Sequence, residues 1–227
     1  MNSVIVVAID GPAGSGKSSV SKAVATQLRF SYYDTGAAYR ALAWAARAAG
    51  IDVSDEAAVV AIHHAMSYVA SEDPTNQFFH VDGTDVTQAI RGSDVSGTVS
   101  AIAQHPQVRK DLVEHFRTVI AQCANPGIIM EGRDITTVVA PDADVRVLLT
   151  AAEEVRIQRR EAEMGGTISA PIAQALKDRD RKDQTVVDFM NAAPGVSVLD
   201  SGPLNLEETV EAMLEIIHNQ TGLTSAR

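Results

Sequence analysis

The chain has 227 residues, of which 45% are hydrophobic and 21% are charged. This composition is that of an ordinary globular protein, able to bury a full core as one compact domain or as one core carrying inserted lobes. The formal net charge of −10 argues against a protein that coats nucleic acid or binds anionic membranes, because either partner would be repelled. An anionic substrate would have to be met by a local cluster of basic residues.

The N-terminal segment and the cysteine content favour a cytoplasmic protein. The apolar run at residues 4–9 is too short for a signal-peptide core or a membrane span, and we interpret it as a buried strand. Cys123 is the only cysteine, so no internal disulfide can form, which fits a reducing compartment. We expect this thiol to be packed and inert.

Short apolar runs alternate with longer helical patterns, which predicts an α/β fold with a five-stranded parallel sheet and helices on both faces. The strands are expected at residues 4–9, 31–33, 128–131, 145–149 and 196–199. The helices are expected at residues 17–28, 36–49, 106–124, 153–164 and 206–219.

Two parts of the chain do not fit this simple alternation. The interval between residues 33 and 128 is too long for one crossover and predicts an inserted lobe. Within it, Asp82-Gly83 lies between two β-favouring arms, which predicts a hairpin because both turn positions need positive φ. A second insert is expected at residues 164–171, where Gly165-Gly166 follows an arginine-rich helix and precedes another charged helix. Such a segment can move as a lid.

Residues 11–18 read GPAGSGKS and satisfy the pattern G-x-x-x-x-G-K-[ST] between a predicted strand and a predicted helix. In such a loop the backbone N–H groups and the helix N-terminus favour a bound anion. We expect Lys17 to reach the β- and γ-phosphates of ATP, and the Ser18 hydroxyl to ligate Mg²⁺. The expected nucleotide-binding residues are Gly11, Pro12, Ala13, Gly14, Ser15, Gly16, Lys17, Ser18, Ser19 and Arg156.

A phosphate-binding loop identifies a nucleotide and not a reaction, because GTPases, transport ATPases and small-molecule kinases all use one. A small GTPase would also carry N-K-x-D to read guanine, and the sequence has no such motif. The six histidines show no metal-ligand spacing beside carboxylates or the cysteine, so none is given a catalytic role.

Two arginines follow predicted strands. Arg40 lies in DTGAAYR after the second strand and Arg133 lies in EGRD after the third, on the side of a parallel sheet where ligands collect. We expect both to overlook the crevice at the phosphate loop, where they would neutralise two phosphorylated ligands. A single arginine is more often a solvated charge or a salt-bridge partner, and for Arg40 alone that reading is favoured.

A third group of cations flanks the predicted lid. Arg156, Arg159 and Arg160 precede it, and Arg156 and Arg160 share one helix face. The helix also carries four glutamates that can form salt bridges with some of these arginines. For one or two of the arginines, a role as ordinary solvent-exposed charges therefore remains an open interpretation. We expect at least one of the three to reach ATP when the lid closes. Arg179, Arg181 and Lys182 follow the lid.

Seven segments, taken in their order along the chain, are more specific than the phosphate loop alone: IDGPAGSGKSS, YYDTGAAYR, HPQVR, EGRDITTVV, PDADVRVLLTA, RDRKD and VLDS. Together they resemble the bacterial cytidylate kinases, and the likeness covers essentially the whole chain. The resemblance implies a P-loop nucleoside triphosphate hydrolase fold with an inserted substrate-binding lobe and a short lid. The expected division is a core of residues 1–34, 110–163 and 185–227, a lobe of 35–109 that binds the monophosphate, and a lid of 164–184.

The resemblance also implies the reaction, which is transfer of the γ-phosphate of ATP to CMP or dCMP with Mg²⁺ as cofactor. Thr35, followed by Gly36, matches a small hydroxyl near the substrate phosphate, and Arg40 and Arg133 match phosphate-binding arginines. The positions matched at the substrate base and sugar are Ser100, Arg109 and Asp134 for the cytosine, and Arg179 and Asp183 for the sugar. We expect no nucleic-acid or membrane partner, and a monomer.

The chemistry of cytosine agrees with this assignment. Asp134 can accept from the N4 amino group, and Arg109 can donate to N3 and O2. Uracil reverses the pattern of donors and acceptors on this edge and would set a carbonyl oxygen against the carboxylate, which leaves buried groups unpaired. We therefore expect CMP to be preferred over UMP. The plainer alternatives stay open: Asp134 as an ordinary helix cap and Ser100 as a surface hydroxyl.

One position departs from the family pattern. An arginine that helps to bind the substrate phosphate usually stands three residues after the sugar-binding aspartate, and here that position is Val186. Three explanations remain open: Arg181 or Lys182 substitutes, CMP binds more weakly, or the alignment slips in this stretch.

The expected mechanism is direct in-line transfer without a covalent enzyme intermediate, because a phosphate oxygen is already an anionic nucleophile. Lid closure would exclude water and prevent hydrolysis of ATP. The expected catalytic residues are Lys17, Arg40, Arg133, Arg159 and Arg160. The rival hypotheses are a P-loop kinase for another small acceptor and a non-catalytic nucleotide-binding switch.

Overall fold

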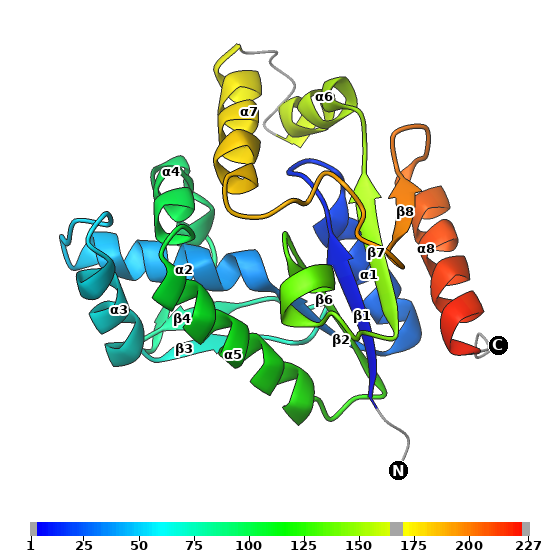
Figure 1. Cartoon of the computed structure of the whole chain (residues 1–227), viewed down its shortest axis with the longest axis horizontal. Helices are drawn as coiled ribbons and strands as arrows, with labels where there is room; N and C mark the ends of the chain where they lie inside the picture. The colour runs from blue at the N-terminus through cyan, green and yellow to red at the C-terminus, as the bar shows by residue number, and fades with distance from the viewer. Residues whose placement is uncertain (1–3, 164–169, 224–227) are drawn as a thin grey trace. The chain divides into compact units, whose positions relative to one another are not determined.

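The computed structural model describes residues 4–163 and 170–223. The chain packs as two units, each internally compact, and both are drawn in Figure 1. The first unit consists of Met1–Tyr32 and Cys123–Arg227, and the second unit consists of Tyr33–Gln122. The boundary between them falls within strand β2 (Ser31–Asp34).

A five-stranded sheet with the order β2-β6-β1-β7-β8 organises the first unit. Its further strands are β1 (Ile5–Asp10), β6 (Gly127–Gly132), β7 (Val145–Thr150) and β8 (Ser197–Asp200). The β1–β6, β1–β7 and β7–β8 pairs are all parallel. The predicted parallel sheet is therefore confirmed, with strand ends within a residue or two of those expected from the sequence.

Helices cover both faces of this sheet, as predicted. Helix α1 (Lys17–Leu28) and helix α8 (Leu206–Thr221) pack on each other and on one face, where Val7 and Ile9 of β1 enter the main core. Side chains alternate along a strand, so the neighbouring Asp10 points to the opposite face. There it meets η2 (Ile135–Val139), a single π-helical turn that packs on β1, β6 and β7.

The second unit is mostly helical and carries a small antiparallel sheet. Its helices are α2 (Thr35–Ala48), α3 (Glu56–Ala65), η1 (Ala89–Arg91), α4 (Ser93–Ile102) and α5 (Pro106–Gln122). Its sheet has the order β3-β4-β5, formed by β3 (Tyr68–Ala70), β4 (Phe79–Val81) and β5 (Thr84–Asp85). The hairpin predicted at Asp82-Gly83 is confirmed: it joins β4 to β5, and the two residues have φ of 50° and 77°.

Two further helices of the first unit lie at the predicted lid, one directly before it and one within it. They are α6 (Glu153–Glu163) and α7 (Ala170–Gln184), which pack against each other. Residues 164–169, including Gly165-Gly166, lie outside the described residues, so the expected lid is described only in its α7 part. Within residues 4–163 and 170–223, every helix is too short or too polar to span a bilayer.

Candidate active site

The glycine loop joins the end of β1 to the start of α1, as the sequence motif predicts. Gly11 has a φ of 153°, and a Cβ atom there would lie 2.0 Å from the Leu149 carbonyl oxygen. Gly14 has a φ of 78°, and its Cβ would lie 2.9 Å from the Arg156 carbonyl oxygen. Both positions therefore require glycine, because the loop is pressed between the end of β7 and the helix α6.

The polar groups of the loop are arranged around Lys17, the first residue of α1. The Lys17 ammonium donates to the Pro12 carbonyl oxygen at 3.0 Å, while Ser18 and Ser19 are exposed. The Ser15 hydroxyl is buried and has no hydrogen-bond partner among the described residues. A buried hydroxyl without a partner, next to a lysine and a glycine cradle, fits a loop shaped for a polyphosphate.

Arg133 lies against this loop. One end of its guanidinium, Nη1, donates to the Gly11 carbonyl oxygen at 3.0 Å. The other end, Nη2, lies 3.0 Å from Asp180 Oδ1 and 3.3 Å from Asp183 Oδ2. The guanidinium also stacks on Phe189, with Cζ 4.2 Å from the ring centroid. A cation predicted from its position after β6 is thus fixed beside the loop by four neighbours.

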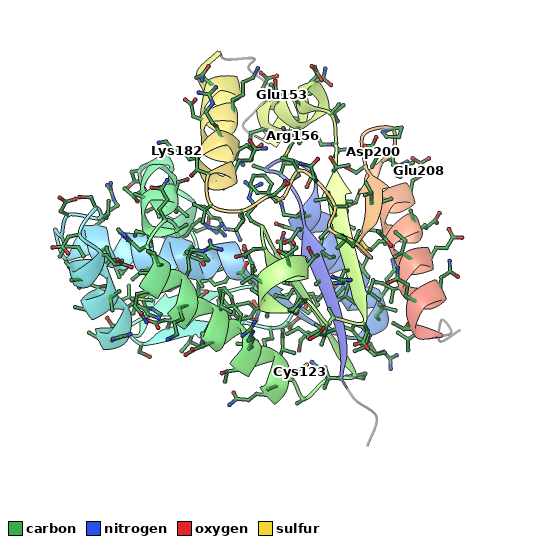
Figure 2. The ribbon with its side chains drawn as sticks, in the orientation of Figure 1. Cys123, Glu153, Arg156, Lys182, Asp200 and Glu208 are labelled. Carbon is green, nitrogen blue, oxygen red and sulfur yellow. The ribbon has the colours of Figure 1, made fainter. Side chains whose placement is uncertain are left out.

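Two of the three α6 arginines also contact the loop. Arg156 is 4% exposed and donates from Nη1 to the Ala13 carbonyl oxygen at 2.9 Å, and Figure 2 shows it beneath α6. Arg159 donates to the Ser15 carbonyl oxygen at 3.4 Å and to the Ser201 hydroxyl at 2.9 Å. Arg160 is exposed. Arg156 and Arg160, expected on one helix face, therefore differ in their surroundings: Arg156 is buried and Arg160 is exposed.

Asp180, to which the sequence patterns assigned no role, connects Arg133 and Arg156. Asp180 of α7 is 6% exposed, and its Oδ1 atom accepts from the Ala13 backbone N–H at 3.3 Å and from Arg133. Its Oδ2 atom accepts from Arg156 Nη1 at 2.5 Å. Asp180 lies in the RDRKD segment, where roles were assigned from the sequence only to its neighbours Arg179 and Asp183. An acidic residue in an arginine-rich helix ordinarily forms a surface ion pair, so no pattern in the sequence singles it out.

Asp10 is a second missed residue. It is 2% exposed and accepts hydrogen bonds from the Ile135 N–H at 2.8 Å and from the Thr136 N–H and hydroxyl at 2.8 and 2.6 Å. Burial raises the pKa of this carboxyl above its ordinary value, the three hydrogen bonds oppose that effect, and the nearby charge of Asp134 adds to it. Asp10 thus ties the start of η2, directly after Arg133 and Asp134, to the base of the glycine loop.

Asp134 itself lies at the position before η2 and is 7% exposed. Its side chain makes no capping hydrogen bond to η2, which removes the plain helix-cap interpretation.

In the second unit, Asp34 and Arg40 form a closed arrangement at the start of α2. Asp34 Oδ1 accepts from the Ala37 N–H at 3.0 Å and caps the helix, while Oδ2 accepts from Arg40 Nη2 at 2.8 Å. Gly36 lies beneath them, because a Cβ there would come within 3.0 Å of Arg40 Nη1. The salt-bridge reading of Arg40 is therefore observed.

Burial raises the pKa of Asp34, but the Arg40 guanidinium and the capping hydrogen bond outweigh it, and the pKa lies below the ordinary value. The neighbouring Thr35 is 4% exposed. The arrangement holds a carboxylate charged and an arginine oriented at the first turn of α2.

The remaining predicted residues are distributed over both units. Ser100 on α4 is 6% exposed, which contradicts the surface-hydroxyl interpretation, and Arg109 on α5 is half-buried. Asp183 is half-buried beside Arg133. Arg179 falls in α7, but its side chain lies outside the described part of the structure.

Neither cation suggested as a substitute at Val186 reaches the loop residues. Arg181 is exposed and lies 3.7 Å from Asp178, and Lys182 is exposed on α7, where Figure 2 labels it. Val186 follows α7 and is half-buried. Of the three explanations, substitution by Arg181 or Lys182 has no support in these contacts.

Within residues 4–163 and 170–223, no group of three His, Cys, Asp or Glu side chains could hold a metal ion.

The fold and this site define a class. A parallel sheet with a glycine loop after its central strand, and guanidinium groups anchored on that loop, characterises the P-loop phosphoryl-transfer proteins. A sequence profile described as cytidylate kinase matches residues 7–219. The chain belongs to the cytidylate kinase family and is, as such, a kinase.

Individual relatives agree with the family assignment. The cytidylate kinase of Streptomyces avermitilis is 40% identical over 218 residues, covering 95% of this chain and 94% of the relative. That of Cutibacterium acnes is 41% identical over 217 residues, covering 95% and 96%. A crystal structure of an uncharacterized protein from Eubacterium ventriosum has a TM-score of 0.52 at 12% identity, covering 94% of this chain and 98% of that one. It supports the fold alone.

Proposed function

We propose that this protein transfers the γ-phosphoryl group of ATP to CMP or dCMP and releases ADP with CDP or dCDP. The observation that carries the proposal is that Arg133 and Arg156 both donate to carbonyl groups of the glycine loop in a chain of the cytidylate kinase family. Cations fixed at a polyphosphate loop are what phosphoryl transfer requires, since the protein contributes positioning and charge stabilisation to that reaction.

On the donor side, the loop from Gly11 to Ser18, together with Ser19, would hold the phosphates of ATP. Lys17 would exchange its bond to the Pro12 carbonyl for the β- and γ-phosphates. Arg156, Arg159 and Arg160 would balance charge on the side of α6. The Ser18 hydroxyl would help to hold Mg²⁺, which would supply positive charge to the bound phosphates.

On the acceptor side, Arg40 and Arg133 would bind the phosphate of the monophosphate, with Thr35 and Gly36 at the start of α2. Ser100, Arg109 and Asp134 would read the cytosine, and Arg179 and Asp183 would hold the sugar. The proposal keeps the division into core, lobe (35–109) and lid (164–184).

Two properties of the whole protein complete the proposal. We place it in the cytoplasm, where ATP and nucleoside monophosphates are available and where a chain with one cysteine needs no disulfide. We also propose that it acts as a monomer.

The test is a coupled assay of ADP release from ATP and Mg²⁺ with CMP, dCMP, UMP, AMP or GMP as acceptor. We expect fast turnover with CMP and dCMP and a loss of roughly a hundredfold with UMP, as for a site whose buried groups are left unpaired. Fast turnover with a different acceptor alone would favour a kinase of other specificity. ATP binding without stimulation by any acceptor would favour a nucleotide-binding switch.

A further inference from the structure

The strongest unexplained contact in the first unit is that of the Asp180 carboxylate with the glycine loop. Its two oxygens receive hydrogen bonds from a loop amide, Ala13 N–H, and from two guanidinium groups, those of Arg133 and Arg156. The carboxylate is 9% exposed at its side chain. Nothing in the proposed reaction assigns it a role, although both arginines it binds are assigned to phosphate.

The three donors around Asp180 form an anion receptor. A backbone amide of a phosphate loop combined with two arginine forks is the donor set that proteins use for phosphate oxygens. A carboxylate oxygen accepts from the same donors in the same way, with a charge of −1. Asp180 therefore presents to the loop and its arginines the chemistry that a nucleotide phosphate would present.

A phosphate and the Asp180 carboxylate cannot share this receptor at low cost. Both are anions, and both would accept hydrogen bonds from the same guanidinium groups. Their charges would therefore lie close together in a site from which water is largely excluded, and the repulsion between them would be strong. One of the two must leave when the other binds.

The arginines do not depend on Asp180 alone for their places. Arg133 retains the Gly11 carbonyl oxygen through Nη1 and the ring of Phe189. Arg156 retains the Ala13 carbonyl oxygen at 2.9 Å. Both guanidinium groups would therefore remain at the loop if the carboxylate moved away, and their freed N–H groups would face the incoming anion.

We infer that Asp180 is an internal stand-in for a nucleotide phosphate: its carboxylate holds Arg133 and Arg156 at the loop before the polyphosphate binds and is displaced when it binds. Asp180 is thus a positioning residue that acts through two arginines. The inference deepens the proposed function, because it rests on the loop being the polyphosphate site, and it does not depend on which monophosphate is the acceptor.

The first test is calorimetric binding of inorganic tripolyphosphate, without Mg²⁺, to the full-length protein and its Asp180→Asn variant. Removing a competing charge should tighten binding by at least about fivefold, because one like-charge interaction near 4 Å gives that factor even in bulk water and more where water is excluded. The same variant should unfold at a lower temperature, because two arginines lose their counter-charge. Tighter binding combined with lower stability separates displacement from a purely structural role, which would weaken both.

Asp178→Asn is the matched control. It removes the same charge from the same helix, but its carboxylate is half-exposed and lies near Arg181, away from the loop. Binding should change there by less than about twofold. Equal or weaker binding by Asp180→Asn than by the wild-type protein would overturn the inference.

A crystal structure of the wild-type protein with tripolyphosphate gives a second test that needs no variant. The Asp180 carboxylate should have left hydrogen-bond distance of the Ala13 N–H, with a phosphate oxygen in its place. A carboxylate that keeps all three donors beside the bound anion would overturn the inference. Both readouts use no acceptor, so they stand even if the acceptor assay rejects CMP and dCMP.

Discussion

The carboxyl ends of β1 and β2 both finish on an aspartate, Asp10 buried and Asp34 half-buried, yet the pKa values of the two carboxyl groups are shifted in opposite directions. Asp10 accepts hydrogen bonds from two backbone N–H groups and a hydroxyl, all of them uncharged, and its pKa is raised. Asp34 accepts from one N–H and from Arg40, and its pKa is lowered. Hydrogen bonds alone do not offset the cost of burying a charge, whereas a cation in contact does.

The comparison also separates two tasks. Asp10 fixes backbone, namely the start of η2 after Arg133, and so supports a catalytic segment indirectly. Asp34 fixes a side chain, the guanidinium of Arg40, and caps α2 with its other oxygen. We therefore expect changes near Asp10 to act on stability and turnover, and changes near Asp34 to act on binding of the acceptor.

The largest effect is expected for Arg133→Ala, on the segment that Asp10 supports. Losing a cation anchored at the loop should lower kcat/KM by roughly 10²- to 10³-fold, as for removal of one transition-state donor. The measurement is steady-state ADP release with CMP. Arg47→Ala, on α2 and exposed beside Asp94, is the control, and a loss of similar size there would contradict a specific role.

The next effect is on stability. Asp10→Ala leaves two N–H groups and one hydroxyl buried without an acceptor, which should lower the free energy of unfolding by about 3 to 5 kcal/mol. Urea denaturation measures it, with the exposed Asp142 changed to Ala as control. If Asp10→Ala cost no more than the control, η2 would not depend on this carboxylate.

Asp34→Asn should have a smaller and different effect. Asparagine caps a helix as well as aspartate does, so stability should change by less than about 0.5 kcal/mol, while Arg40 loses its charged partner. We expect the KM for CMP to rise about tenfold with little change in kcat, corresponding to one weakened charge-assisted contact. A fall in kcat at unchanged KM would argue against Arg40 as an acceptor-binding residue.

Asp134→Ala should chiefly erode base preference. We expect the ratio of kcat/KM for CMP over UMP to fall by roughly tenfold or more, with a smaller loss for CMP than in Arg133→Ala. The same acceptor assay measures it. Equal and mild losses in the two variants would remove both role assignments.

The smallest effect is the pH dependence of stability. The lowered pKa of Asp34 stabilises the folded state above its ordinary value of 3.8, and this stabilisation is lost as the pH falls through the folded-state pKa below that value. The raised pKa of Asp10 has the opposite sign: its contribution is greatest below 3.8 and is lost as the pH rises through the folded-state pKa. Urea titrations of wild type against Asp34→Asn and Asp10→Asn should therefore diverge in opposite directions on acidification, and parallel curves would contradict the comparison.

Much of the fold follows from local signals in the sequence. Apolar runs bounded by glycine and proline gave the five strands, and Asp82-Gly83 gave the hairpin, because each signal depends only on neighbouring residues. Helices α3 and α4 and strand β3 were not predicted, since they lie in the long interval where packing within the second unit decides structure. The π-helical turn ITTVV was missed because a run of β-branched residues favours extended structure.

The candidate site divides in the same way. The glycine loop and Arg133 were predictable, because a motif and a strand end locate them. Asp10 and Asp180 were not, because one is the last residue of an apolar strand and the other is an acid in a basic helix. Their partners lie 125 and 167 positions away along the chain, and no local pattern announces such a contact.

The Ser201 hydroxyl, which donates to the Ser15 carbonyl oxygen at 2.9 Å, joins residues 186 positions apart. A ribosome completes the glycine loop early and must then add the entire second unit before the brace behind that loop exists. Contacts of such long sequence separation form late and slowly. During synthesis the nucleotide loop therefore lacks this hydrogen bond until the VLDS segment has been made, after the other residues that contact the loop.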